Sequence, residues 1–322
     1  MKRNCLLNGL GRFGLHLLRF YLKNYNKSNF EITSINDSFL KNLNLKEYLS
    51  NDKYIDFSEF SPIFEQNKIT FNLAEIDKEI EISISSYEFD DLSKTNNDIL
   101  LECSGLNLSR DLYYKKINQG FEKILLSHSY DDADTTFIYK FDNKSDLTES
   151  KLISYGSCTV NCYTPFAAFV NKMYEVKNSH ASFVHNLPQY KIDKNIIEKK
   201  YCTLQSNAPK KLSFLNDEFI VDYTLVPYTG VSMFTFIFET FKSVESDFIF
   251  NLDDALIKNK LESIYGVAKS IKDPNLYKFT EKSGIFDLQM SKSFNNKIYL
   301  TGVFDNENSV NRYFDVLNLI CH

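Results

Sequence analysis

Hydrophobic and polar positions alternate differently in the two halves of the chain. In the first half, short apolar runs are separated by stretches with helical spacing, a pattern typical of a parallel sheet with helices on both faces. These runs span 31–35, 80–84, 98–102 and 123–127. Beyond residue 158 the strand-like runs are longer. The run 232–238 alternates throughout, which indicates an antiparallel sheet with one covered face.

A glycine-rich turn follows the first apolar strand. Residues 6–14 read LLNGLGRFG, and a helical stretch comes next. In such a turn Gly9 permits a sharp reversal, Gly11 lets the backbone approach a pyrophosphate, and Gly14 lets helix and strand pack closely. The glycine spacing alone is a weak signal for dinucleotide binding, so the residues after the second predicted strand are needed to support it.

An acidic residue follows the second predicted strand, 31–35. Asp37 lies 23 residues after Gly14 (37 − 14), near the position from which a carboxylate binds a ribose 2′-hydroxyl. A turn or capping role for Asp37 is the alternative. With the glycines, this residue predicts an α/β fold: a Rossmann-type, doubly wound parallel sheet, followed by an α+β domain with a mostly antiparallel sheet.

The segment 156–163, GSCTVNCY, places Cys158 at or just before the start of a predicted helix. Free backbone N–H groups and the positive end of the helix dipole favour a thiolate there. A thiolate attacks carbonyl carbons, whereas most free cysteines are small core residues. This segment alone leaves both interpretations of Cys158 open.

Composition narrows the class of protein. The formal charge of −5 over 322 residues gives no general attraction to nucleic acid, and six cysteines without a regular framework indicate a reducing compartment. No run approaches the roughly 18 apolar residues of a membrane span, and Asn8 and Gly9 interrupt the apolar run that a signal peptide needs. Too few ligands surround Cys158 for a metal. We therefore expect a cytoplasmic protein without a metal site that binds neither membrane nor nucleic acid.

Together, residues 8–14 and 157–162 resemble the glyceraldehyde-3-phosphate dehydrogenase family. The sequences FDNE at 304–307 and NR at 311–312 resemble the C-terminal element of that family. Weaker similarities occur in the same order as in the family, at 102–105, 226–232 and 283–287. The resemblance therefore spans nearly the whole chain and marks a divergent member.

The resemblance implies an oxidoreductase in which Cys158 attacks an aldehyde and His185 acts as the base. His185 lies 27 residues after Cys158 (185 − 158), at the end of an apolar run, where a structural histidine is the alternative. Of the other histidines, His128 is a second candidate and His180 is expected in a turn. The residues expected to contact the cofactor are Asn8, Gly9, Gly11, Arg12, Phe13, Gly14, Asp37, Ser127 and Asn306. Those expected to contact the substrate or an anion are Ser157, Thr159, Ser206 and Asn207.

The resemblance also implies domain bounds and an assembly. The NAD-binding domain is expected to span 1–157 with the C-terminal helix 305–322, and the catalytic domain 158–304. A homo-oligomer, either a dimer or a tetramer, is expected. Asp37 favours NAD because a carboxylate repels the 2′-phosphate of NADP, although Ser38 leaves NADP open.

Two positions depart from the family in a chemically important way. Leu225 stands where the family has an arginine that binds phosphate, and Pro188 stands where it has a threonine. The segment from His185 to Leu225 (225 − 185, or 40 residues) is also shorter. Each lost charge-assisted hydrogen bond is worth about 1.5–3 kcal/mol, so we expect weakened binding of a phosphorylated substrate.

Three functions stay open. The first is an NAD-dependent dehydrogenase of an aldehyde, phosphorylated or not, with inorganic phosphate or water as the acyl acceptor. The second is a dinucleotide-binding regulatory protein that lacks turnover. The third is a relative that acts on an acyl phosphate or a semialdehyde. An intact Cys158–His185 pair favours the first.

Overall fold

The computed structural model describes residues 2–42, 44–50, 55–93, 96–187, 192, 195–305 and 309–322. The chain divides into two compact units. The first consists of Met1–Phe137, Asp142–Gly156 and Val310–His322, and the second of Ile138–Phe141 and Ser157–Ser309. These bounds differ from the expected division at residues 138–141, 157 and 305–309.

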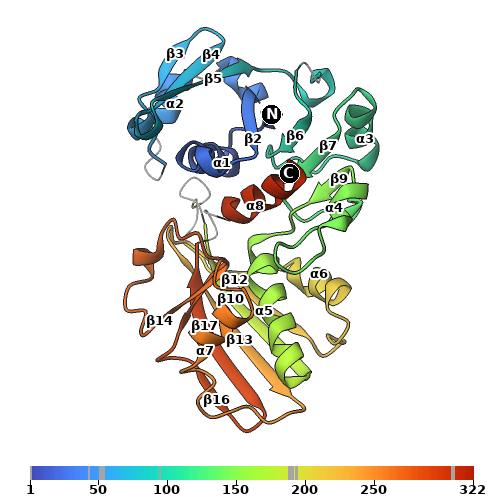
Figure 1. The fold of residues 1–322 in the computed structure, drawn as a ribbon, viewed down its shortest axis with the longest axis vertical. Coiled ribbons are helices and arrows are strands. Elements are labelled where there is room, and N and C mark those ends of the chain that lie inside the picture. The colour runs from blue at the N-terminus through green and yellow to red at the C-terminus, as the bar shows by residue number, and fades with distance from the viewer. Residues whose placement is uncertain are drawn as a thin grey trace. The chain divides into compact units, whose positions relative to one another are not determined.

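A nine-stranded sheet forms the centre of the first unit within the described residues, in the order β3-β4-β5-β2-β1-β6-β7-β9-β8 (Figure 1). Its parallel strands are β1 (Arg3–Asn8), β2 (Phe30–Asn36), β5 (Lys78–Ser85), β6 (Ile99–Glu102), β7 (Lys123–Leu126), β8 (Thr135–Thr136) and β9 (Leu152–Ser154). At one edge, β3 (Ile63–Glu65) and β4 (Lys68–Leu73) are antiparallel. The carboxyl ends of the parallel strands thus share one edge, where ligands bind in sheets of this kind.

Helices cover both faces of this sheet. Leu6 and Leu7 are neighbours on β1 and point to opposite faces, and both are buried. Helix α3 (Arg110–Asn118) packs on the face that contains Leu6, while α1 (Arg12–Lys23) packs against α8 (Val310–Ile320). The shorter helices are α2 (Leu45–Ser50), α4 (Ser145–Glu149) and the 3-10 turns Tyr25–Lys27, Ser38–Asn42, Ser58–Phe60, Ala74–Ile76 and Phe89–Asp91.

The second unit contains an eight-stranded sheet in the described residues, in the order β11-β12-β10-β13-β17-β15-β14, with β16 paired to β17. The strands are β10 (Val176–Asn186), β11 (Glu198–Lys199), β12 (Ile220–Val226), β13 (Ser232–Thr240), β14 (Tyr265–Ala268), β15 (Gly284–Asp287), β16 (Lys292–Phe294) and β17 (Lys297–Phe304). Most pairs are antiparallel, but β10 pairs with β12, and β14 with β15, in parallel.

Aromatic packing fixes helix α5 (Cys158–Tyr174) on this second sheet. Phe166 of α5 contacts Phe236 and Phe286, which lie on β13 and β15. The remaining helices of the unit are α6 (Leu204–Lys211), α7 (Leu252–Lys258) and the 3-10 turn Pro274–Tyr277. The large buried rings supply the core volume that a chain without tryptophan must obtain from Phe and Tyr.

The predicted fold class is confirmed: a doubly wound, mainly parallel sheet occurs with a second, mostly antiparallel one. One local prediction is wrong. His180 lies inside β10 rather than in a turn, and its Nε2 is 3.1 Å from Oδ2 of Asp222 on the neighbouring β12. The apolar run before His185, residues 181–184, is only part of β10. The strand extends beyond this run in both directions, because cross-strand pairing continues through the polar positions.

Candidate active site

Cys158 is the first residue of α5, as its sequence context predicts. Ser157 caps this helix, and its Oγ accepts a hydrogen bond from the backbone N–H of Val160 at 3.4 Å. The residue as a whole is only partly buried. The fold therefore presents Cys158 at the end of a helix where backbone N–H groups are free to stabilise negative charge.

The structure brings Cys158 and His185 together. Sγ of Cys158 lies 3.7 Å from Nε2 of His185, and Nδ1 of the same ring lies 2.7 Å from the backbone oxygen of Asn186. A carbonyl oxygen only accepts hydrogen bonds, so Nδ1 must bear a proton. In the neutral ring, Nε2 then presents its lone pair to the thiol. This is the tautomer that a general base needs.

The protonation state of Cys158 departs from the sequence-based expectation. Burial raises the pKa of the Cys158 thiol to about 12, and the neighbouring Cys202 acts in the same direction. The backbone N–H groups of Thr159 and Cys158 lower the pKa by less. The expected resting thiolate is therefore not supported, because desolvation outweighs the helix terminus. A resting thiol must transfer its proton to His185 as it attacks.

The predicted anion-binding residues fall into two groups. Oγ1 of Thr159 lies 3.1 Å from Oγ of Ser157 and 3.5 Å from Sγ of Cys202, so these side chains form one cluster at the start of α5. On α6, the Ser206 hydroxyl donates to the carbonyl of Thr203 at 3.2 Å, and Asn207 is buried. Pro188 lies outside the described residues. The hydroxyl groups near Cys158 are thus largely engaged with each other.

The three glycines of the first turn have distinct structural roles. Gly9 has a φ of +94°, and a Cβ there would lie 2.3 Å from the backbone nitrogen of Ser104. A Cβ on Gly14 would lie 2.0 Å from the carbonyl oxygen of Gly9. By contrast, a Cβ on Gly11 would meet nothing within 4 Å. The space in front of Gly11, at the start of α1, is therefore open and suits a phosphate group.

The remaining residues expected at the cofactor differ in their contacts. Asp37 accepts backbone hydrogen bonds from Leu10 (2.7 Å, Oδ2) and Phe39 (2.9 Å, Oδ1), so it has a turn role, yet each oxygen keeps a lone pair for a ribose hydroxyl. The ring of Phe13 packs edge-on against two tyrosines, which makes it part of an aromatic cluster. The backbone N–H of Ser127 donates to the carbonyl of Glu102. Arg12 begins α1, and Asn306 lies outside the described residues.

A buried row of polar side chains supports the glycine turn, and local sequence patterns do not predict it. Asn36 Nδ2 donates to Asn8 Oδ1 at 2.8 Å, and Asn8 Nδ2 donates to Glu102 Oε2 at 2.6 Å. The other carboxylate oxygen of Glu102 accepts from the backbone and side chain of Ser104. Burial raises the pKa of Glu102, whereas these hydrogen bonds lower it. The row joins the carboxyl ends of β2, β1 and β6.

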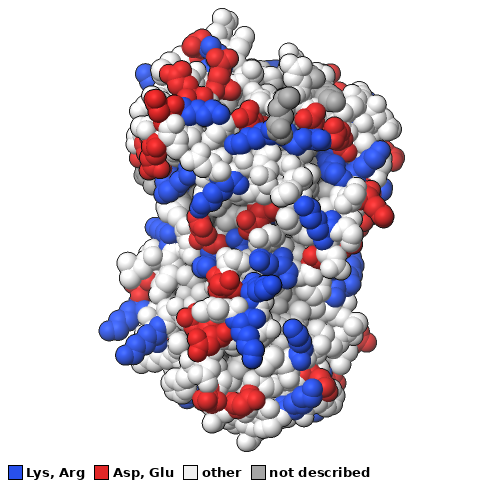
Figure 2. Space-filling view, in the orientation of Figure 1, with Lys and Arg blue, Asp and Glu red and all other residues white. Residues whose placement is uncertain are grey.

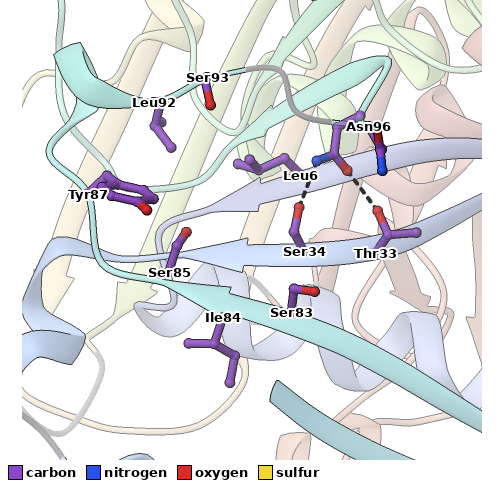
Figure 3. A pocket seen from close by; sticks show the side chains of 11 residues that line it. Leu6, Thr33, Ser34, Ser83, Ile84, Ser85, Tyr87, Leu92, Ser93 and Asn96 are labelled. Carbon is purple, nitrogen blue, oxygen red and sulfur yellow. Dashed lines mark hydrogen bonds between the residues drawn. The ribbon is translucent and has the colours of Figure 1, made fainter. Parts of the chain in front are cut away.

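A cavity of about 350 Å³ lies beside this row, over β2 and β5 (Figure 3). Its walls include Ser34, Ser83, Ser85 and Tyr87, and Ser34 accepts a hydrogen bond from Asn97 at 2.9 Å. The backbone N–H of Tyr87 donates to Asn36, which connects the cavity to the buried row. The cavity belongs to the first unit and includes neither Cys158 nor His185.

The surface and the remaining side chains add three observations. Figure 2 shows acidic and basic side chains interspersed over the face that it draws. Across the described ranges, none of the helices combines the length and the apolar character that crossing a membrane requires. In the same ranges, no group of three or more His, Cys, Asp or Glu side chains is arranged to hold a metal ion.

Comparison with known proteins finds similarity to glyceraldehyde-3-phosphate dehydrogenases. The chain is 29% identical over 195 residues to the enzyme of Priestia megaterium and 25% identical over 193 residues to glyceraldehyde-3-phosphate dehydrogenase 1 of Bacillus subtilis. Each match covers 60% of this chain and 55% of the relative. A third match, to the enzyme of Xanthobacter flavus, is 32% identical over 88 residues, or 27% of this chain and 26% of the relative.

The chain thus spans about half the length of the first two curated relatives that it matches. No family model matches it. The similarities confirm the resemblance inferred from residues 8–14 and 157–162, and they mark this chain as a divergent relative.

Proposed function

We propose that this chain is a nicotinamide-dependent aldehyde dehydrogenase, in which Cys158 is the nucleophile and His185 the base. One observation carries the proposal: Sγ of Cys158 lies 3.7 Å from His185 Nε2, in a ring whose other nitrogen is held by a backbone carbonyl. The similarity to glyceraldehyde-3-phosphate dehydrogenases supports the reaction class. The open space at Gly11 supports a dinucleotide.

The proposed reaction begins with the thiol. Cys158 Sγ bonds to the aldehyde carbon while its proton passes to His185 Nε2, and the carbonyl oxygen takes up the negative charge. The backbone N–H of Cys158 stabilises that charge until His185 returns the proton and forms the thiohemiacetal hydroxyl. His185 then removes the hydroxyl proton as hydride leaves the carbon. A nicotinamide held by the first unit would supply the hydride acceptor, and phosphate or water would then release the acyl group from the Cys158 thioester.

Residues of the first unit supply the proposed cofactor site. The backbone around Gly11 and the start of α1 face the pyrophosphate, and Asp37 binds the ribose hydroxyls. The carboxylate of Asp37 disfavours a 2′-phosphate, so NAD is proposed over NADP. The buried row of Asn36, Asn8 and Glu102 holds the turn in place.

A homo-oligomer is also proposed. Val184, Met233 and Tyr299 lie on one face of the second sheet, as their cross-strand pairing requires, and are 42, 44 and 40% exposed. Exposed apolar side chains that share one face of a sheet suit an interface between copies. Light scattering after size-exclusion chromatography would detect the assembly, and Met233→Asp should weaken it. A monomer at micromolar concentration would refute it.

The raised pKa of Cys158 favours a second candidate, a dinucleotide-binding protein without aldehyde chemistry. A thiol that stays protonated at neutral pH is a poor nucleophile unless a base assists it. This candidate predicts NAD binding with no aldehyde-dependent formation of NADH.

Rapid mixing of the protein with NAD and a panel of aldehydes separates the two candidates. We expect NADH formation that Cys158→Ser abolishes and that His185→Asn slows by about 10²–10⁴-fold. The matched controls are Cys321→Ser, a partly exposed thiol in the first unit, and His180→Asn, on the same strand as His185. Both controls should keep full activity. Intact NAD binding with no NADH from any aldehyde would support the second candidate instead.

A further inference from the structure

Apolar and aromatic side chains surround the Cys158–His185 pair. The ring of Tyr223 lies 5.2 Å from the His185 ring between centroids, and that of Phe304 lies 6.0 Å away. Leu225 sits directly beside His185 in the register of β10 and β12. Tyr223 and Phe304 thus contact the ring of the base, and Leu225 is its partner on the neighbouring strand.

Because of the pleat of the sheet, Tyr223 and Leu225 lie on the same face as His185. Phe183 pairs with Tyr223 and His185 with Leu225, and residues two apart on a strand point to the same face. Leu225 is 8% exposed, so its side chain is packed against this face rather than turned to solvent. A guanidinium at residue 225 would add a positive charge on the strand beside His185, whereas the isobutyl group there carries no charge and offers no hydrogen bond.

The polar groups near the thiol do not replace a cation. Ser157 Oγ accepts from the Val160 backbone and lies within hydrogen-bond distance of Thr159, whose hydroxyl also contacts Cys202. Burial raises the pKa of both Cys158 and Tyr223. Against these described side chains, which are uncharged, a doubly charged phosphate would lose hydration without gaining a paired charge from them, which is costly.

We propose that this site accepts an uncharged aldehyde with an apolar substituent and discriminates against phosphorylated aldehydes. The inference rests on the proposed function and adds to it the class of substrate. Leu225 is the specificity-determining residue, because it occupies the strand position beside the base from which a charged side chain would act.

The first test compares two alkylating reagents of similar size that differ in charge. Iodoacetamide is neutral and iodoacetate is anionic, and neither requires NAD. The ratio of their rates at Cys158, normalised to the ratio for 2-mercaptoethanol, should favour iodoacetamide by about tenfold, equivalent to roughly 1.4 kcal/mol. Leu225→Arg should remove this preference, whereas the volume-conserving Leu225→Met should retain it. Equal normalised rates in the wild-type protein would overturn the inference.

The second test measures turnover. We expect kcat/KM for butanal to exceed that for D-glyceraldehyde 3-phosphate by at least about tenfold, and Leu225→Arg to reverse the order. The matched control is Ile220→Arg, which adds the same charge to the exposed beginning of β12, in register with His180. Preference of the wild-type protein for the phosphorylated aldehyde would overturn the inference. If neither aldehyde yields NADH, the proposed function fails, while the alkylation ratio still decides the charge preference of the site.

Discussion

Sγ of Cys158 lies 3.7 Å from Nε2 of His185, and the thiol at this distance has a pKa raised to about 12 by burial. The raised pKa favours a thiol, rather than a preformed thiolate, beside the imidazole. The base is in position, but proton transfer must accompany attack on the substrate.

This protonation state predicts the pH dependence of Cys158 alkylation by iodoacetamide. Because the pKa is raised, the thiolate fraction grows about tenfold per pH unit throughout the range from about pH 6 to pH 9, and the rate should follow it. Mass spectrometry localises the adduct, and Cys158→Ser gives the background. A plateau that begins below neutral pH would show instead that a thiolate–imidazolium pair exists at rest.

Glu102 should matter for cofactor affinity although it lies beneath the glycine turn. Its carboxylate accepts hydrogen bonds from Asn8 on one oxygen and from Ser104 on the other. In Glu102→Gln the new amide must face one of these donors, at a cost of about 1–3 kcal/mol. Thermal unfolding should therefore show a lower Tm, and calorimetry should show weaker NAD binding because the turn that faces the cofactor is displaced. An unchanged Kd with a lowered Tm would assign Glu102 to stability alone.

Glu122→Gln is the isosteric control for that experiment. Glu122 is exposed at the opposite end of the same sheet and pairs with Arg3. Surface ion pairs contribute about 0–1 kcal/mol, so NAD affinity and Tm should stay close to those of the wild-type protein.

Two glycines of the same turn should respond oppositely to alanine. A Cβ on Gly14 would collide with the carbonyl oxygen of Gly9, so Gly14→Ala should destabilise the fold by about 1–3 kcal/mol. A Cβ on Gly11 enters open space, so Gly11→Ala should cost less than about 1 kcal/mol of stability but obstruct the pyrophosphate. Urea unfolding and NAD titration separate these effects. Full NAD affinity in Gly11→Ala would contradict the proposed cofactor site.

Asp134 predicts a pH-dependent contribution to stability. Burial alone would raise the pKa of this carboxyl, but hydrogen bonds from the Leu152 and Lys151 backbones, with Tyr114 and Arg110, lower it to about 2. A depressed folded-state pKa contributes stability above the unfolded pKa of about 3.9, and this contribution is lost as the pH falls towards 2. Asp134→Asn should therefore cost about 1–3 kcal/mol at pH 7 and much less near pH 2.

Urea unfolding across this pH range measures the difference between the two proteins. Asp132→Asn is the control, because the structure shows the backbone carbonyl of Asp132, rather than its carboxylate, bonded to Arg110. A gap between Asp134→Asn and the wild-type protein that stays constant from pH 7 to pH 2 would rule out this assignment.

Local sequence patterns were sufficient to predict where the main helices and strands lie. The start of α5 at Cys158 follows from the capping Ser157, and the turn after β1 follows from its glycines, because both depend on backbone preferences of nearby residues. The protonation state of Cys158 could not be predicted this way. It depends on burial and on Cys202, which is 44 residues further along the chain (202 − 158).

The buried polar row escaped prediction for the same reason. Asn8, Asn36 and Glu102 end three different strands, and nothing in the local sequence of one indicates contact with the others. Only the parallel register of β2, β1 and β6 brings them into one line. A sequence signal for this row would be a polar residue at the carboxyl end of each of three adjacent strands.

In the proposed mechanism, Cys158 becomes acylated during oxidation of an aldehyde. Intact-mass spectrometry after mixing the protein with NAD and butanal, in phosphate-free buffer and with a rapid acid quench, tests it directly. We expect an adduct on Cys158 equal to the mass of the aldehyde less two hydrogens, absent without NAD and absent in Cys158→Ser. An unmodified Cys158 despite NADH formation would contradict the covalent mechanism.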